Sequence, residues 1–158
     1  MGGDGASVSE LRIHVAARSA APVERVWAVL ADARRWKEWT PLRTSELERE
    51  GSPDPDGVGA LRRFGLGPVV SREEVVGFEP PRRLVYELRS GLPIRGHRAE
   101  VTLTPWGDGT EIAWQSRFEP RIPGTGRLLH AFLRAVITDI ARRLARRASS
   151  EEGGGRGV

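Results

Sequence analysis

Five polar side chains in the middle of the chain have the types that acid–base chemistry on a carbonyl compound requires. They are Arg62, Glu74, Tyr86, His97 and Ser116. A carboxylate or an imidazole next to a carbonyl group can move a proton, and a guanidinium or hydroxyl can donate a hydrogen bond to an enolate oxygen. The first four are candidate catalytic residues. Ser116 lacks the G-x-S-x-G context of a nucleophile and is a candidate hydrogen-bond donor.

Each of these side chains also has an explanation that involves no catalysis. Tyr86 is more often part of a cavity wall than a catalyst. Glu74 pairs equally well with a neighbouring arginine, either Arg72 or Arg62, since a buried charge needs a partner. His97 is more readily explained as a histidine at a pocket rim with no chemical task, and Arg62 is equally well explained as a surface residue. The residues alone leave both explanations open.

The composition argues against several other kinds of site. The chain of 158 residues contains no cysteine, so it has neither a thiol nucleophile nor a thiolate metal site. Its three histidines are dispersed, and no metal is expected. The glycine-rich segment 51–59 lacks the Gly-Lys-Ser/Thr ending of a phosphate-binding loop, and no cofactor is expected. Because 21 acidic residues are interspersed with 25 lysines and arginines, nucleic acid is not expected as a partner.

The length fits one domain. The polar or glycine-rich ends, 1–7 and 149–158, are expected to be disordered, which leaves 8–148 as the folded domain. The N-terminus does not resemble a signal peptide, and no apolar run approaches the roughly 20 residues of a membrane span. Together with the lack of cysteine, this favours the cytoplasm. A monomer or a homodimer is expected.

The positions of the candidate residues depend on the elements around them. Alternating apolar residues predict a strand over 8–19. The next apolar positions recur at i, i+3, i+4 and i+7, which is typical of one helix face; they are Val23, Val26, Trp27 and Leu30. A second short helix carries Trp36 and Trp39 and stops at Thr40-Pro41. Strand-like segments separated by turn signals follow at 42–50, 60–66, 69–79, 83–90, 95–105 and 110–119.

The helical period returns over 123–148. Consecutive strands joined by short turns favour an antiparallel sheet, and a long amphipathic helix must bury its apolar face against that sheet. The sequence therefore predicts an α+β fold in which a curved sheet wraps around the final helix. A pocket between the two is expected.

Four stretches of the chain form a recognisable set: APVERVWAVLADARRWKEWTP (21–41), VGALRRF (58–64), RLVYELRSGLP (83–93) and GDGTEIAWQSRFEP (107–120). Together they resemble the START-like, or SRPBCC, superfamily, in its bacterial polyketide cyclase/dehydratase-like branch. The resemblance implies a helix-grip fold, in which a seven-stranded antiparallel sheet grips the C-terminal helix over a hydrophobic cavity. Members of this superfamily bind lipids, sterols, hormones or polyketides, and some are enzymes.

Strand alternation sorts side chains onto the cavity face or the outer face. Tyr86, Trp114 and His97 are expected to point inward. Segments 60–66 and 69–79 are ambiguous, and the interpretation preferred for them places Arg62 and Glu74 inward. The full predicted ligand-binding lining is Arg62, Phe64, Glu74, Tyr86, Leu88, His97, Val101, Trp114, Ser116, Phe118, Leu133 and Ile137. The hairpin turning at 91–93 is expected at the rim of this pocket.

Three functions remain open at this point. The first is binding of a hydrophobic or amphipathic small molecule between sheet and helix. The second is a polyketide cyclase or dehydratase that uses the four candidate catalytic residues. The third is a protein or nucleic-acid interaction module acting through the final helix, whose arginines are Arg127, Arg134, Arg142, Arg143, Arg146 and Arg147. The third function requires a filled core, whereas the first two require a cavity.

Overall fold

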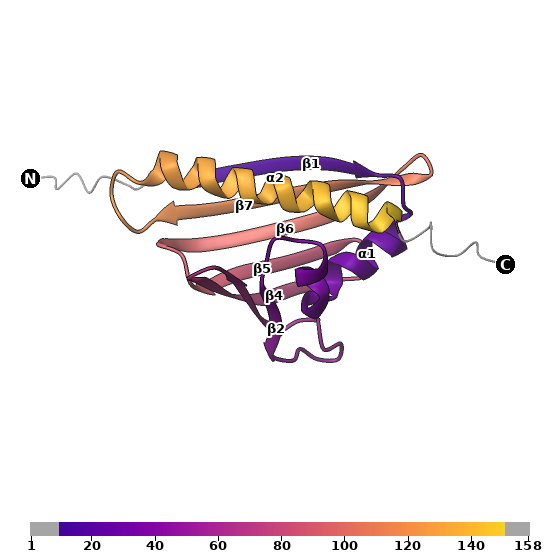
Figure 1. Cartoon of the computed structure of the whole chain (residues 1–158), viewed down its shortest axis with the longest axis horizontal. Helices are drawn as coiled ribbons and strands as arrows, with labels where there is room; N and C mark the ends of the chain where they lie inside the picture. The colour runs from indigo at the N-terminus through magenta and orange to yellow at the C-terminus, as the bar shows by residue number, and fades with distance from the viewer. Residues whose placement is uncertain (1–9, 151–158) are drawn as a thin grey trace, which may run out of the picture.

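The computed structural model describes residues 10–150 and is shown in Figure 1. Strand β1 is followed by two short helices, six further strands and a long helix. The elements are β1 (Leu11–Ser19), α1 (Val23–Ala31), the 3₁₀ helix η1 (Ala33–Glu38), β2 (Thr44–Arg49), β3 (Leu61–Leu66), β4 (Val69–Glu79), β5 (Arg83–Ser90), β6 (Ile94–Trp106), β7 (Gly109–Pro120) and α2 (Gly126–Ser150).

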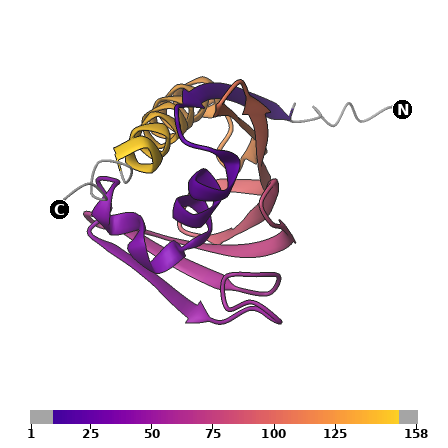
Figure 2. The same ribbon diagram turned by 90° about the vertical axis from the view of Figure 1, so that its right-hand side faces the viewer.

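The seven strands form one antiparallel sheet in the order β1-β7-β6-β5-β4-β3-β2. Strands β2 to β7 lie side by side in sequence order, and β1 forms one edge of the sheet by pairing with β7 along its whole length. Figure 2 shows the sheet curving around α1, η1 and α2. The helix-grip fold that the sequence predicted is therefore confirmed.

Aromatic residues fix the two short helices on the sheet. The Trp36 ring of η1 stacks on Phe64 of β3 with the ring centroids 4.9 Å apart. Its indole N–H donates to the backbone carbonyl of Leu30 at 2.9 Å, which ties η1 to the end of α1. Trp27 of α1 contacts Phe78 of β4 with the two rings tilted by 57° and 5.2 Å between their centroids. These contacts bury the aromatic rings, and the indole N–H of Trp36 keeps a hydrogen-bond partner.

Helix α2 packs closely at its C-terminal half and more openly at its N-terminal half. Ala141, Ala145 and Ala148 are buried, and small side chains let a helix approach the sheet closely. The Ser19 hydroxyl of β1 donates to the carbonyl of Ala145 at 2.7 Å, which anchors this half. In contrast, Phe132 near the start of the helix is half exposed. Space between helix and sheet is therefore expected under the first half of α2.

The ends of the domain differ slightly from prediction. Helix α2 continues to Ser150, so residues 149 and 150 are helical and do not belong to a disordered tail. Strand β1 begins at Leu11 instead of residue 8. The predictions of disorder for 1–7 and 151–158 lie outside the described residues. None of the helices within residues 10–150 is long and apolar enough to cross a membrane.

Candidate functional site

A cavity of about 150 Å³ lies between the sheet and the N-terminal half of α2. Most of its wall is aliphatic or aromatic. Its lining consists of Trp36, Leu42, Phe64, Leu66, Val69, Ser71, Glu73, Tyr86, Leu88, Leu92, Ile94, His97, Trp114, Ser116, Phe132, Leu133, Val136, Ile137 and Ile140. An apolar cavity of about 150 Å³ holds a ring the size of benzene.

The cavity opens at one end of the molecule. Leu66, Val69 and Phe132 line it and yet are 43%, 43% and 50% exposed, so they form its mouth. The β5–β6 hairpin contributes Leu92 and Ile94 to the lining. A ligand larger than one ring would extend through this mouth.

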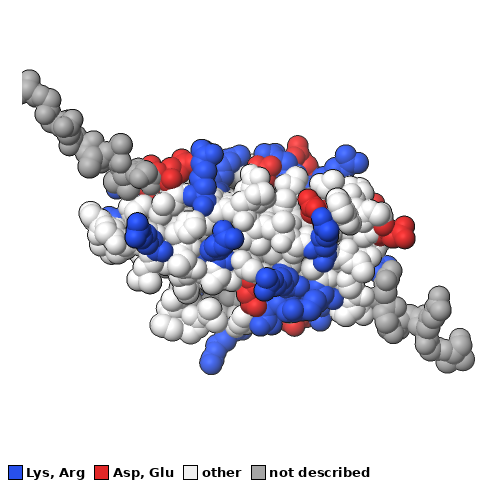
Figure 3. All heavy atoms as spheres, turned by 90° about the horizontal axis from the view of Figure 1, so that it is seen from above, with Lys and Arg blue, Asp and Glu red and all other residues white. Residues whose placement is uncertain are grey.

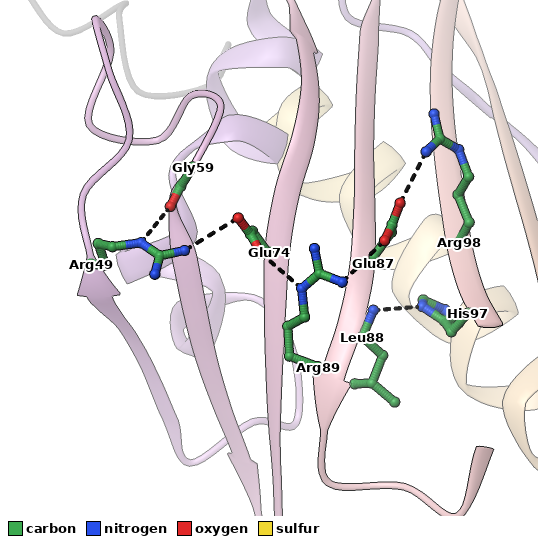
Figure 4. Close-up of polar contacts among 8 residues, drawn as sticks. All are labelled: Arg49, Gly59, Glu74, Glu87, Leu88, Arg89, His97 and Arg98. Atoms are coloured by element: carbon green, nitrogen blue, oxygen red, sulfur yellow. Dashed lines mark hydrogen bonds and ion pairs between the residues drawn. The ribbon is translucent and has the colours of Figure 1, made fainter. Parts of the chain in front are cut away.

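His97 enters the cavity wall through a bulge in β6. The pairing of β6 with β7 skips between Arg95 and Arg98, and Gly96 in the skipped pair has a φ of +62°, which a residue with a side chain rarely adopts. The His97 ring then accepts a hydrogen bond at Nδ1 from the backbone N–H of Leu88, at 3.0 Å (Figure 4). The side chain thus takes the place of a backbone acceptor next to the hairpin.

This hydrogen bond fixes the protonation state of His97. Only an unprotonated Nδ1 can accept from an N–H, so the proton of the neutral ring is on Nε2. Burial lowers the pKa of His97 from its ordinary value of 6.5, while the negative charges of Glu73 and Glu87 act in the opposite direction. At neutral pH the cavity wall therefore carries a neutral imidazole that donates from Nε2.

An ion pair between Arg62 and Glu73 lies beside the cavity. The Arg62 side chain is 1% exposed, and its Nη2 donates to Oε2 of Glu73 at 2.8 Å. The guanidinium carbon lies 4.9 Å from the ring centroid of Trp36 and 4.6 Å from that of Tyr86. The other two nitrogens, Nε and Nη1, are buried without a hydrogen-bond partner among the described residues. Glu73 thus lines the cavity, and the desolvated guanidinium of Arg62 contacts it from the side away from the cavity.

Tyr86 and Ser116 supply hydroxyl groups to the wall. The Trp114 indole N–H donates to the Tyr86 hydroxyl at 3.1 Å. Burial, and next the nearby charge of Glu73, raise the pKa of Tyr86, so the phenol stays protonated and can act as a donor. The buried Ser116 hydroxyl has no hydrogen-bond partner in residues 10–150. A buried hydroxyl without a partner is costly, and an acceptor on a bound molecule would satisfy it.

Comparison with known proteins agrees with this geometry. Residues 10–149 match the family described as polyketide cyclase/dehydrase and lipid transport. The chain belongs to this family. A search of curated proteins finds none that matches this family member.

Solved structures of low sequence identity share the fold. A START superfamily protein from Mycobacterium smegmatis superposes with a TM-score of 0.77 at 14% identity, over 89% of this chain and 98% of the other. The Zhui aromatase/cyclase from Streptomyces sp. R1128 gives a TM-score of 0.73 at 18% identity, over 95% and 100%. The di-domain aromatase/cyclase StfQ of the steffimycin pathway gives 0.76 at 16%, over 91% of this chain and 52% of that protein.

Most of the lining predicted for this family member does reach the cavity. The predicted residues at its wall are Phe64, Tyr86, Leu88, His97, Trp114, Ser116, Leu133 and Ile137. Arg62 points inward as predicted but lies behind the wall. Val101 and Phe118 were also expected at the wall, but both are fully buried in the core. Alternation indicates which face a residue occupies, but it does not indicate where neighbouring side chains already fill the space.

The prediction that Glu74 faces inward is wrong. Glu74 lies on the outer face of the sheet, where it pairs with Arg49 at 3.3 Å and with Arg89 at 2.7 Å (Figure 4). The pairing of β4 with β5 skips a residue between Val75 and Gly77. This bulge reverses the alternation, so Phe78 and Glu74 occupy opposite faces although both have even numbers.

Glu73 is the cavity carboxylate that the sequence analysis missed. A signal for it was present, because Glu73 lies directly opposite Arg62 in the β3–β4 register. An inward arginine needs an acidic neighbour, and the residue across the strand is the nearest candidate. Along α2, Val136 and Ile140 were also missed as lining residues, although they share the helix with Leu133 and Ile137.

The His97 hydrogen bond leads to a prediction about pH. The pKa of His97 is lower in the folded protein than in the unfolded chain. As the pH falls through 6.5, the unfolded chain therefore takes up the proton first, and the free energy of unfolding decreases. His97→Asn keeps an acceptor for the Leu88 N–H but cannot be protonated. Between pH 7.5 and pH 5.5 the melting temperature should therefore fall more steeply in the wild type than in His97→Asn. His14→Asn, at an exposed position of β1, should keep the wild-type slope, and equal slopes in all three proteins would refute the assignment.

Proposed function

We propose that this protein binds a hydrophobic or amphipathic small molecule, polyketide-, lipid- or sterol-like, in the cavity under α2. The observation that carries the proposal is an apolar cavity, open at one end, whose wall holds hydrogen-bond donors not used within the described chain. Apolar enclosure with a few placed polar groups is typical of small-molecule sites. Membership of a family described by polyketide cyclization, dehydration and lipid transport supports the same function.

The polar groups favour a ligand that presents acceptors. Ser116, Tyr86 and the Nε2 of His97 can all donate, whereas Glu73, the one carboxylate of the wall, already accepts from Arg62. A carbonyl or ether oxygen would therefore be accommodated better than an ammonium group. Aromatic rings of Trp36, Phe64 and Trp114 favour a flat apolar body for the rest of the molecule.

A second function, a polyketide cyclase or dehydratase, is favoured by one specific observation. The neutral imidazole of His97 and the protonated hydroxyl of Tyr86 lie on neighbouring strands, with 5.9 Å between ring centroids. A proton-transfer group beside a hydrogen-bond donor is the arrangement that enolization requires. Arg62 would act through Glu73 in this function. The third function, an interaction module on α2, is disfavoured because its required filled core is absent at the cavity.

A pair of matched probes tests the binding proposal. 2-Acetylnaphthalene and 2-isopropenylnaphthalene have nearly the same shape, since a C=CH₂ group replaces the C=O group, but only the ketone carries an acceptor. The ketone should bind at least about fivefold more tightly, since one added hydrogen bond contributes on the order of 1 kcal/mol. Titration by ¹H–¹⁵N NMR should show the largest shifts at Leu88, His97 and Ser116. Equal affinity for both probes would contradict the acceptor preference, and no binding of either would contradict the proposal.

A further inference from the structure

The outer face of the sheet carries a line of alternating charges that runs from β2 to β6. Figure 4 shows Arg49 of β2 paired with Glu74 of β4, and Glu74 paired with Arg89. Arg89 binds Glu87 of β5 at 3.1 Å, and Glu87 binds Arg98 of β6 at 3.0 Å. Each charge in this line therefore has neighbours of opposite sign.

The alternation fails beyond Arg98. The strand register places Arg117 of β7 directly opposite Arg98, and Arg12 of β1 directly opposite Arg117. Like charges in directly opposed positions of a sheet are unfavourable. Arg117 has no ion pair within residues 10–150, and the partner of Arg12 is the partly exposed Glu10 beside β1. We call these three residues, Arg12, Arg117 and Arg98, the arginine row.

A hollow of about 540 Å³ lies over the arginine row. His14 and Gln115 also line it, and both can donate hydrogen bonds. The one carboxylate of its lining, Glu100, is engaged by Arg83 at 2.8 Å. Within residues 10–150, Arg117 has no acidic partner, Arg12 and Arg98 have one each, and the carboxylate in the lining of the hollow is already engaged. On the face seen in Figure 3, which includes β1 and α2, basic side chains also outnumber acidic ones.

We propose that the arginine row docks an acidic α-helix of a partner protein. Neighbouring strands are about 4.8 Å apart, so the three arginines span about 10 Å. Acidic residues at i, i+4 and i+7 share one face of a helix and rise by about 6 and 10.5 Å along its axis. A helix lying across the strands therefore presents one carboxylate to each arginine. The bound helix would continue the alternating charges that stop at Arg98.

The spacing and surroundings favour a helix over phosphate-bearing partners. A single phosphate is too small to contact all three positions of the row. A nucleic-acid backbone would continue past the row toward β5, where it would meet Glu87. A short acidic helix can end before that point. The arginine row lies on the side of the sheet turned away from the cavity, so this proposal is independent of what the cavity binds.

Two helical peptides of equal composition test the proposal. Both are alanine-rich with three glutamates; in one peptide the glutamates lie at i, i+4 and i+7 on one face, and in the other they are spread evenly around the helix. Fluorescence anisotropy of labelled peptides, at low salt, should show at least about fivefold tighter binding of the one-face peptide. Arg117→Glu should weaken that binding about tenfold or more, and added salt should weaken it in the wild type.

Arg142→Glu on α2 is the matched control, because it makes the same change in net charge at an exposed position outside the row. It should leave the affinity for the one-face peptide unchanged. If Arg117→Glu loses its native circular dichroism, Arg117→Gln replaces it and should weaken binding in the same direction. Equal binding of the two peptides, or equal losses in Arg117→Glu and Arg142→Glu, would overturn the proposal. So would full competition by inorganic pyrophosphate or duplex DNA at equal charge concentration, which would assign the row to phosphates.

Discussion

Replacing Glu73 by glutamine should lower the free energy of unfolding by about 3 kcal/mol, because it leaves the Arg62 guanidinium without a counter-charge. Arg62 is 1% exposed, and Nη2 donates its hydrogen bond to Glu73. Two further nitrogens of the same group are already unpaired among the described residues. Removing the charge of Glu73 therefore leaves a buried cation that water cannot reach. Urea denaturation followed by circular dichroism measures the effect.

Two control variants separate this effect from a general loss of packing. Glu74→Gln changes the adjacent residue on the outer face, where its partners are exposed arginines, and should cost less than about 1 kcal/mol. The double variant Arg62→Met/Glu73→Gln removes both charges and should recover most of the stability lost by Glu73→Gln alone, since an apolar replacement of a buried pair is often nearly neutral. A Glu73→Gln protein as stable as Glu74→Gln would show that the buried pair is unimportant.

Filling the cavity from α2 should abolish ligand binding without unfolding the protein. Val136 lines the cavity and is only partly buried, so an indole at this position can project into the space. Val136→Trp should weaken the binding of 2-acetylnaphthalene by about 50-fold, or ~2.3 kcal/mol. The NMR titration designed for the matched probes measures this directly, and the melting temperature reports whether the fold is kept.

The neighbouring residue provides the control for the cavity variant. Ala135 lies on the exposed side of α2 and is not part of the cavity lining. Ala135→Trp adds the same indole one position away and should bind the probe as the wild type does. If both tryptophan variants retain wild-type affinity, the probe binds elsewhere. If both lose it, the effect comes from helix α2 as a whole and not from the cavity.

Sequence patterns predicted the elements well because each pattern reports local chemistry. The alternation of Trp114 and Ser116 along β7 placed both at the cavity, and the 3.6-residue period of α2 placed Leu133 and Ile137 there. Pattern and fold agree where the strand pairs regularly with its neighbour, as β7 does with β1.

The prediction failed where the backbone departs from regular pairing. In β4, the bulge between Val75 and Gly77 reverses the predicted faces of Glu73 and Glu74. Gly77 was the one signal for it, because an isolated glycine inside a strand often marks a bulge, but a glycine alone does not tell which residue is the extra one. The role of His97 was also only partly visible. Alternation placed it inward, but its hydrogen bond to Leu88 depends on the bulge at Gly96 and on the register of β5 against β6. Both are properties of paired strands and are not contained in one strand's sequence.

Native mass spectrometry of the protein purified from the organism that encodes it tests the central claim most directly. The wild type and Ala135→Trp should each carry the same non-covalently bound small molecule, and Val136→Trp should have the mass of the bare chain. Extraction should yield a largely apolar compound with at least one carbonyl or ether oxygen. A bare wild-type protein, or the same adduct on Val136→Trp, would contradict the claim that the cavity under α2 is a ligand-binding site.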